Sequence, residues 1–313
     1  MSGETGAVGR MKLGLMPTLA ENSVGSSAPH GRTPRYSDIQ RMARVAEDIG
    51  VDSFWLADHL LYRFPDSGEN GAWEVFTILG AVAAVTKRIQ LGPLVACVSF
   101  RNPALLAKMA ESLDEISDGR FILGLGAGWH QPEYDAFGYP FDHRASRFEE
   151  ALRIIVPLLR EGYVDFQGQY YQARDCALRP RGPSGRGPAV WIGADKPRML
   201  RMVARHADAW NTVWHRWPAG VERVYPNMKQ ACEEEGRDPA TLELTAGTHV
   251  RLLRPGETRQ EDYEGIQGEA EEVAEGLRGF EAIGVKHLVV VVEGNEVAGF
   301  ERFGRVVELM GQR

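Results

Sequence analysis

The sequence predicts one α/β domain, a (β/α)8 barrel of the TIM-barrel type with insertions at its C-terminal mouth. Apolar runs of strand length alternate with amphipathic helical patterns along the chain. Parallel strands need crossover connections, and the helical patterns supply them. The chain has 313 residues, which suits one barrel, and no low-complexity segment or long linker divides it.

Eight apolar runs have the length and composition of buried strands. In chain order they cover residues 11–16, 53–57, 89–95, 121–125, 189–193, 209–213, 242–253 and 287–292. A helical pattern follows each run, although an irregular stretch over 254–268 intervenes after the seventh. Eight such units indicate closure into a barrel rather than an open sheet.

Helices are predicted over residues 37–49, 73–85, 103–116 and 197–206, and Gly50 is expected to end the first because glycine readily adopts the left-handed conformation.

The stretch over residues 129–188 is the largest irregularity. It contains a helical pattern over 147–161 and a β-hairpin pattern over 164–171 that turns on Gly168. Functional loops of these barrels follow the strands. We therefore expect the whole stretch to lie at the C-terminal mouth.

Composition excludes several classes of protein. A formal net charge of −7 argues against a nucleic-acid partner, and no apolar run approaches the length of a membrane-spanning helix. Cys97, Cys176 and Cys232 lack paired spacing, which indicates reduced thiols and a cytoplasmic location. The small, polar residues 1–10 lack a signal-peptide core, so we expect a disordered lead before one domain over 11–313.

Asp58 and His59 follow the second strand, at the end of the barrel where active sites form. A histidine there can transfer a proton or contact a cofactor edge, and the adjacent carboxylate can fix its tautomer. A structural pair that caps the next helix is the alternative, and the residues alone leave both open.

The turn after the fifth strand is a candidate phosphate site. Gly193, Ala194, Asp195 and Lys196 precede a predicted helix, whose first N–H groups attract anions, and Lys196 adds a positive charge. An ordinary strand–helix turn is the alternative.

The glycines at 124, 126 and 128 have the spacing G-x-G-x-G, which differs from the dinucleotide-binding pattern. They let the backbone bend at the strand end and leave room for a ring system. No histidine or cysteine spacing supports a metal site, so no metal is expected.

Several segments, in their order and spacing, resemble the bacterial luciferase-like superfamily of flavin-dependent oxidoreductases. The resemblance runs from about Met11 to the C-terminus. The segments that carry it are GVDSFWLADH at 50–59, TKRIQLG at 86–92, NPALLAK at 102–108, SDGR at 117–120, GAGW at 126–129, Glu133-Tyr134, Phe137-Gly138, WIG at 191–193 and ADAWN at 207–211.

The resemblance implies a barrel that holds FMN, or the deazaflavin coenzyme F420, at its C-terminal mouth. It implies a non-prolyl cis peptide between Leu94 and Val95 behind the cofactor ring. It also implies that Ala127, Gly128 and Trp129 line the cofactor and that residues 193–196 hold its phosphate.

The Asp58-His59 pair is similar to that of the deazaflavin branch of the family, where the histidine faces the reactive ring, and this favours F420. In the branch that oxidises sugar phosphates, a general acid stands where this chain has Ala127, and a tryptophan stands at Arg63. Sugar-phosphate oxidation is therefore not expected.

Three histidines remain as acid–base candidates: His59, His130 and His215. The predicted function is hydride transfer between F420 and a small organic substrate. The first alternative is an FMN-dependent monooxygenase that receives reduced flavin from a separate reductase. The second alternative is a non-catalytic flavin-binding barrel.

Three loops are expected to shape the substrate pocket, at residues 18–33, 61–72 and 129–142, the first of them as a mobile lid. Relatives of this kind are often dimers, so a homodimer is expected.

Overall fold

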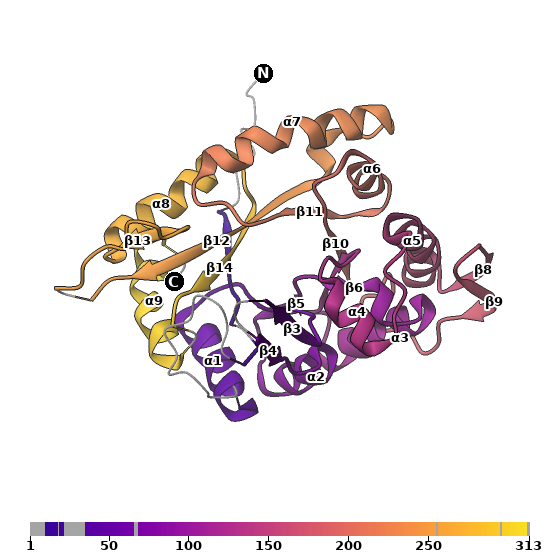
Figure 1. Cartoon of the computed structure of the whole chain (residues 1–313), viewed down its shortest axis with the longest axis horizontal. Helices are drawn as coiled ribbons and strands as arrows, with labels where there is room; N and C mark the ends of the chain where they lie inside the picture. The colour runs from indigo at the N-terminus through magenta and orange to yellow at the C-terminus, as the bar shows by residue number, and fades with distance from the viewer. Residues whose placement is uncertain are drawn as a thin grey trace, which may run out of the picture.

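The computed structural model describes residues 10–17, 19–21, 35–65, 68–254, 256–294 and 296–311. The eight predicted strands are all present and run parallel around a barrel (Figure 1). They are β1 (Lys12–Leu15), β2 (Ser53–Leu56), β5 (Gln90–Pro93), β7 (Ile122–Gly126), β10 (Ala189–Gly193), β11 (Ala209–Thr212), β12 (Glu243–Leu252) and β14 (His287–Val292).

The strands pair in chain order, and β14 returns to β1 with Lys12 opposite His287. Between β5 and β7 the ladder narrows to a single parallel bridge, which joins Leu91 to Phe121. The two backbones approach so closely here that a Cβ atom on Gly92 would lie 2.1 Å from the Ile122 carbonyl oxygen. The short strand β6 (Ala96–Cys97) then pairs with β7. The predicted fold class is therefore confirmed.

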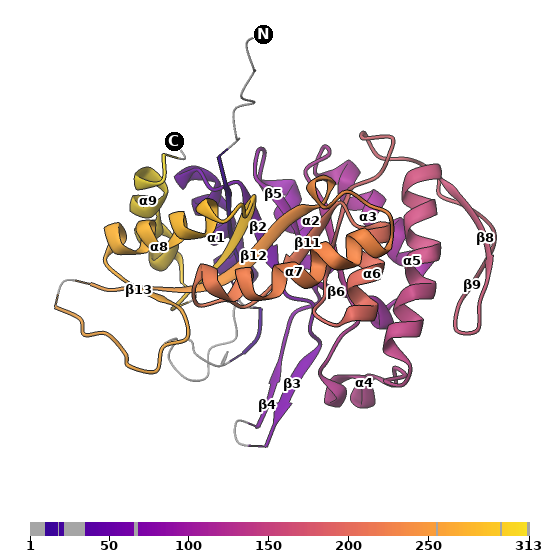
Figure 2. The same cartoon turned by 90° about the horizontal axis from the view of Figure 1, so that it is seen from above.

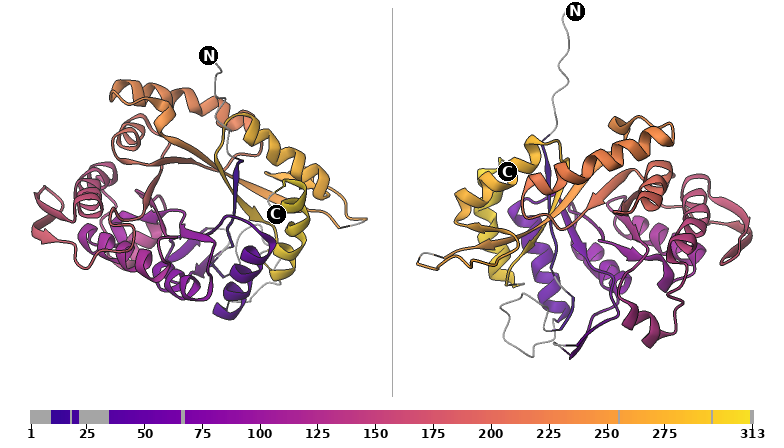
Figure 3. Two further views of the ribbon diagram at one scale, coloured as in Figure 1. Left: turned by 180° about the vertical axis from the view of Figure 1, so that it is seen from behind. Right: turned by 45° about the horizontal axis from the view of Figure 1, so that its top comes forward.

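Eight helices, one after each barrel strand, cover the outside of the barrel (Figures 1 and 3). They are α1 (Tyr36–Ile49), α2 (Val75–Val85), α3 (Pro103–Ile116), α5 (Arg144–Glu161), α6 (Pro197–His206), α7 (Pro218–Glu234), α8 (Ala270–Ala282) and α9 (Val297–Leu309). In α1 the buried residues Ile39, Met42 and Ala46 recur at helical spacing and face the sheet. As predicted, Gly50 ends this helix with φ of 91°.

The expectation that residues 129–188 lie together at the C-terminal mouth is correct only for their first part. The short helix α4 (Gln131–Phe137) lies at the mouth, whereas α5 is the fourth outer helix, because its apolar stripe packs on the barrel (Figure 2). The hairpin of β8 (Tyr163–Gln167) and β9 (Gln172–Ala177) starts at the opposite end of the barrel and runs along the outer side of α5. It turns at Gly168 as predicted.

A second hairpin projects from the mouth, formed by β3 (Leu61–Phe64) and β4 (Gly68–Gly71) (Figure 2). The remaining elements are β13 (Ile266–Gly268), which pairs with β12, and the 3-10 turns η1 (Val98–Phe100) and η2 (Pro239–Thr241). Residues 1–9 of the predicted disordered lead and most of the predicted lid lie outside the described residues, whereas Arg10 is described and pairs with Asp52 at 2.8 Å. Among the helices of the described part of the chain, none has the length and apolarity to span a membrane.

Aromatic side chains fill the barrel beneath the mouth. The rings of Trp55 and Trp191 stack with centroids 4.5 Å apart, and His287 meets both of them edge-on. Nε2 of His287 lies 2.6 Å from the Ser53 hydroxyl. Burial lowers the pKa of His287 to about 3, so the imidazole is neutral at ordinary pH. This layer packs the barrel interior, and its three rings are not part of the cavity lining.

Candidate active site

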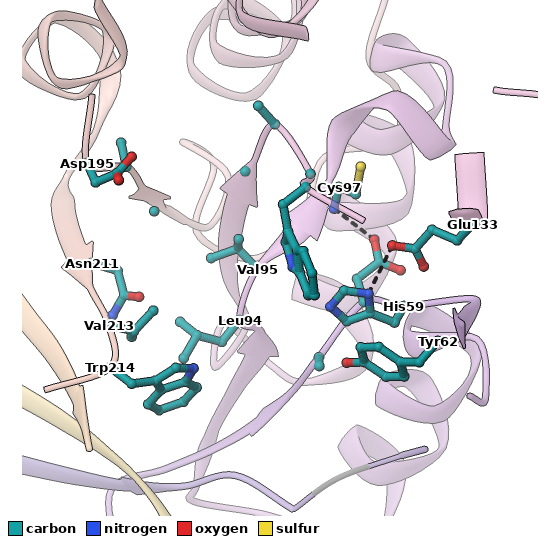
Figure 4. A pocket seen from close by; sticks show the side chains of 18 of the residues that line it. His59, Tyr62, Leu94, Val95, Cys97, Glu133, Asp195, Asn211, Val213 and Trp214 are labelled. Atoms are coloured by element: carbon teal, nitrogen blue, oxygen red, sulfur yellow. Dashed lines mark hydrogen bonds and ion pairs between the residues drawn. The ribbon is translucent and has the colours of Figure 1, made fainter. Parts of the chain in front are cut away.

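A cavity of about 960 Å³ opens at the carboxyl ends of the barrel strands, where the fold places active sites. It has two walls with a hydrophobic back between them (Figure 4). We call the side with β3 and α4 the hairpin wall, and the side with the β10–α6 turn and the end of β11 the helix wall. Figure 4 shows His59, Tyr62 and Glu133 on the hairpin wall, Asp195, Asn211 and Trp214 on the helix wall, and Leu94 and Val95 between them.

His59 lines the cavity and is held by a carboxylate that the sequence did not predict for this role. Its Nδ1 lies 3.0 Å from Oε1 of Glu133, and the exposed fractions of the two side chains are 14% and 2%. The second carboxylate oxygen accepts the backbone N–H of Leu60 at 2.9 Å. An ionised carboxylate only accepts hydrogen bonds, so Nδ1 of His59 carries a hydrogen. No described residue hydrogen-bonds its other nitrogen, Nε2.

Asp58 does not orient His59, and this corrects the expected role of the neighbouring carboxylate. Asp58 accepts two hydrogen bonds from Arg101, at 2.6 and 3.0 Å, and a third from the backbone N–H of Cys97. Arg101 also donates to Glu74 at 2.6 Å. Burial raises the pKa of Asp58, and the hydrogen bonds from Arg101 oppose that effect. The carboxylate thus anchors β6 beneath the hairpin wall.

Three aromatic rings extend the hairpin wall outward from His59. Tyr62 packs against the His59 ring, with centroids 4.3 Å apart. Phe64 lies nearly parallel to Tyr62 on one side and to Trp129 on the other, at 6.0 and 6.4 Å. Burial raises the pKa of Tyr62, which keeps its hydroxyl protonated. All three rings line the cavity.

Leu94 and Val95 form the back of the cavity, and the peptide bond between them is cis, as expected. The glycines of β7 leave room for this bulge, because a Cβ atom on Gly126 would lie 2.5 Å from Val95 Cγ2. Gly128 has φ of 74°, and a Cβ atom there would lie 1.9 Å from the Tyr134 hydroxyl. Ala127, Gly128 and Trp129 all line the cavity, next to the place predicted for the cofactor.

The helix wall begins with Gly193, Ala194, Asp195 and Lys196, which all line the cavity. Lys196 is the N-cap of α6 and gives the helix no side-chain cap. Its ammonium group lies 3.1 Å from Asp195, and both side chains are 77% exposed. This turn presents backbone N–H groups and a positive charge to the cavity, as a phosphate site requires.

The end of β11 completes the helix wall. Asn211 is buried, and its amide nitrogen donates to Thr245 Oγ1 at 3.0 Å. A second non-prolyl cis bond, which the sequence did not predict, joins Val213 to Trp214. The Trp214 ring lies 4.8 Å from that of His249, a further histidine that lines the cavity. Burial lowers the pKa of His249.

The other two candidate histidines, His130 and His215, do not line the cavity. Nε2 of the buried His130 accepts the backbone N–H of Arg63 at 3.0 Å, and this bond fastens β3 to the start of α4. Nε2 of His215 lies 2.8 Å from the Thr212 hydroxyl. Burial lowers the pKa of both imidazoles. Of the three histidines, the structure brings only His59 to the cavity.

Glu133 and Tyr62 on the hairpin wall, and Arg101 beneath it, are residues of the candidate site that the sequence did not single out. Glu133 stands in a segment that carries the family resemblance, and this was the available signal for it. Its pairing with His59 spans 74 residues and depends on how α4 docks. No periodicity or spacing encodes such a contact.

Comparison with known proteins finds relatives over most of the chain. The sequence profile described as luciferase-like monooxygenase matches residues 11–282. Pyrimidine monooxygenase RutA from Enterobacter sp. (strain 638) is 33% identical over 248 residues, which cover 75% of this chain and 66% of that protein. The phthiodiolone/phenolphthiodiolone dimycocerosates ketoreductase of Mycobacterium bovis (strain BCG / Pasteur 1173P2) is 28% identical over 256 residues, which cover 76% of this chain and 66% of the relative.

A solved structure shares the fold. The coenzyme F420 dependent tetrahydromethanopterin reductase from Methanopyrus kandleri superimposes with a TM-score of 0.78 at 19% identity, covering 96% of this chain and 100% of the other. At this identity the similarity concerns the fold alone. The chain spans 66%, just under two thirds, of the length of the curated relatives it matches.

Proposed function

The chain belongs to the luciferase-like monooxygenase family, and on that premise we propose that it uses coenzyme F420 to move a hydride to or from a small organic substrate. One observation carries the proposal. Glu133 holds Nδ1 of His59 at 3.0 Å, which leaves Nε2 as the unoccupied nitrogen of a histidine that lines the cavity. Hydride transfer to or from an oxygen-bearing carbon also requires a proton carrier, and imidazole exchanges protons at neutral pH.

The residues present fit a flat ring that carries a phosphate. Apolar side chains at Leu94 and Val95 offer a surface for the ring. Gly193 has no side chain to fill the space next to Val95, where a Cβ atom would lie in contact at 3.4 Å. Ala194 and Lys196 lie at the start of α6, where backbone N–H groups and the ammonium would hold the phosphate. When bound, F420 supplies a hydride donor or acceptor at one ring carbon.

His59 and Glu133 divide the proton chemistry between them. With hydrogen on Nδ1, neutral His59 has a lone pair on Nε2, which accepts the proton of a substrate hydroxyl during oxidation. In the reverse direction the protonated imidazole returns that proton to the substrate oxygen. The carboxylate of Glu133 holds the ring in place and keeps the hydrogen on Nδ1. The neighbouring rings of Tyr62 and Phe64 limit the access of water to this imidazole.

An FMN-dependent monooxygenase is the second candidate, and the description of the matched family and the name of the Enterobacter relative favour it. It would need reduced flavin from a separate reductase. A barrel that only binds flavin is a weaker candidate, because the relatives are named as enzymes. We further propose a cytoplasmic homodimer, which cell fractionation and light scattering of the purified protein would test.

Titration of the purified protein with F420 and with FMN tests the choice of cofactor. We expect F420 to bind more tightly, and the F420-loaded protein to exchange hydride with an alcohol or ketone without consuming oxygen. Tight FMN binding, no F420 binding and oxygen consumption with reduced FMN would replace the proposal with the monooxygenase. Binding of either cofactor without turnover of any substrate would favour the non-catalytic barrel.

A further inference from the structure

The basic side chains of the cavity lining are gathered at one end of the cavity. Among the described residues that line it, the arginines and lysines are Arg144, Lys196 and Arg198. Arg144 is the first residue of α5, and the other two stand at the start of α6, which packs beside α5 (Figure 1). We call this end, defined by these three residues, the cationic corner.

Arg198 ties the first turns of the two helices together at this corner. Its Nη2 donates to the Ser146 hydroxyl at 3.0 Å and to the Glu149 carboxylate at 2.8 Å, both on α5. Glu149 also lies 3.9 Å from Arg205, so one carboxylate is shared by two guanidinium groups. The corner therefore keeps a positive charge close to the start of α5, even though Arg198 has an acidic partner.

Arg144 is the corner residue that no described carboxylate neutralises. Its Nη1 donates to the Gly128 carbonyl oxygen at 2.8 Å, and its guanidinium lies 3.9 Å over the ring of Phe141. No described residue accepts a hydrogen bond from Nε or Nη2. These two nitrogens form one edge of the guanidinium, and their parallel N–H groups match the two oxygens of a carboxylate. The stacked ring and the Nη1 bond hold this edge in a defined plane at the cavity surface.

The cavity continues past the turn at residues 193–196, where the cofactor phosphate is proposed. Arg144 and Ala145 on α5, and Arg198 and Met199 on α6, line this continuation. FMN ends at its phosphate and has no group to place there. F420 continues beyond its phosphate through a lactate into a chain of glutamates, and each glutamate adds a carboxylate. An unneutralised guanidinium beyond the phosphate turn therefore suits the cofactor that carries a tail.

We propose that the cationic corner is a second anion subsite, which binds the tail carboxylates of F420 and so distinguishes this cofactor from FMN. The Nε and Nη2 edge of Arg144 donates to one carboxylate, and Arg198 adds positive charge while it stays bonded to Glu149. The assignment rests on the proposed function for the use of F420. It goes beyond that function because it places the part of the cofactor that takes no part in hydride transfer.

Fluorescence titration with three ligands tests the assignment in the purified wild-type protein. The ligands are F420 with at least two glutamates, a truncated deazaflavin that ends at its phosphate, and FMN. The first two share the ring and differ in the tail. We expect F420 to bind about 3- to 10-fold more tightly than the truncated deazaflavin, the range of a partly exposed charge-assisted contact. The difference should become smaller as the salt concentration rises.

Arg144→Met should weaken F420 binding by about 3- to 10-fold and leave the affinities for the truncated deazaflavin and for FMN within about 2-fold of wild type. Binding of the truncated ligand also shows that the variant is folded. Two matched controls replace arginines of the same helices that do not line the described cavity. They are Arg147→Met on α5, whose native arginine pairs with Asp142, and Arg205→Met on α6, whose native arginine pairs with Glu235. Both should keep the wild-type ratio of the F420 and truncated-ligand dissociation constants.

Equal affinity of the wild type for F420 and the truncated deazaflavin would overturn the assignment, and this comparison needs no variant. An unchanged ratio in Arg144→Met, or equal weakening of all three ligands, would overturn it as well. Hydride transfer separates the assignment from the proposed function. If the tail strengthens binding through Arg144 but no substrate is turned over, the subsite stands and the proposed function fails. If F420-dependent turnover occurs without any effect of the tail, the proposed function stands and the subsite is wrong.

Discussion

The two walls of the cavity are built in different ways. On the hairpin wall the carboxylate of Glu133 is 2% exposed and bonded to both a side chain and the backbone. On the helix wall Lys196 and Asp195 are each 77% exposed and bond mainly to one another. The first wall is therefore held in one geometry, whereas the second offers charge and free N–H groups without a fixed side-chain arrangement.

This difference suits the two walls to the two tasks that we propose for them. A proton carrier must stay within hydrogen-bond distance of a reacting oxygen, so its ring needs support from buried partners. A phosphate is bound largely by charge and by backbone N–H groups, and water already surrounds it. Buried ion pairs are costly to desolvate and rarely the best route to stability. Their concentration on one wall indicates a role in positioning.

The largest effect is expected from His59. His59→Ala should lower the rate of hydride transfer by roughly 10²–10⁴-fold, the usual range for a general acid or base. Its affinity for F420 should change by only a small factor, because the cofactor phosphate is proposed to bind the other wall. Single-turnover absorbance measurements and titration would check both values. His130→Asn is the control from the same wall, and it should keep most of its rate. Normal turnover in His59→Ala would remove the histidine from the mechanism.

Arg101 tests whether buried ion pairs support the hairpin wall. Arg101→Met leaves Asp58 buried without its cation, and should lower the free energy of unfolding by roughly 3–5 kcal/mol. Burial raises the pKa of Asp58. The loss of unfolding free energy in Arg101→Met should therefore become smaller as the pH falls and the Asp58 carboxyl group takes up a proton.

Urea denaturation at neutral and mildly acidic pH would measure this. Lys196→Met on the helix wall is the matched control, and it should cost less than about 1 kcal/mol because its ion pair is exposed. Similar losses of unfolding free energy in Arg101→Met and Lys196→Met would contradict the claim that buried ion pairs support only the hairpin wall.

Glu133 tests the positioning of His59. Glu133→Gln should slow hydride transfer by about 10- to 100-fold, since a hydrogen bond to a charged group contributes about 1.5–3 kcal/mol. The pH profile of the rate and the imidazole nitrogen chemical shifts of His59 should also change, whereas a merely structural role would leave them as they are.

Glu111→Gln is a suitable control, because Glu111 is also buried and accepts hydrogen bonds from the Arg181 side chain and the Gly182 backbone, away from the cavity. It should leave both readouts of His59 unchanged. Identical His59 shifts in wild type and Glu133→Gln would refute the positioning role.

The smallest effect belongs to the helix wall. Lys196→Ala should weaken F420 binding by no more than about 5-fold, the range of an exposed charge contact, and should make the affinity less dependent on salt. Fluorescence titration of the cofactor at two ionic strengths would measure it. An unchanged dissociation constant at every salt concentration would place the phosphate elsewhere.

The barrel and the helix wall could be predicted from the sequence because their signals are local. The strand lengths, the helical spacing and the end of the first helix at Gly50 can each be predicted from residues that are close together in the sequence. The turn over residues 193–196 is also contiguous, so its place before a helix is visible in the sequence. The cis bond between Leu94 and Val95 followed from the family resemblance rather than from local pattern.

The hairpin wall could not be predicted in the same way, because its contacts join residues far apart in the chain. Asp58 and His59 are adjacent, yet successive backbone positions direct them to different partners, Arg101 and Glu133. Residue types and their order were sufficient for the eight strands and the family. The choice of partner for each side chain depends on how α4 and β3 dock on the barrel, which is a property of three-dimensional packing that no local pattern encodes.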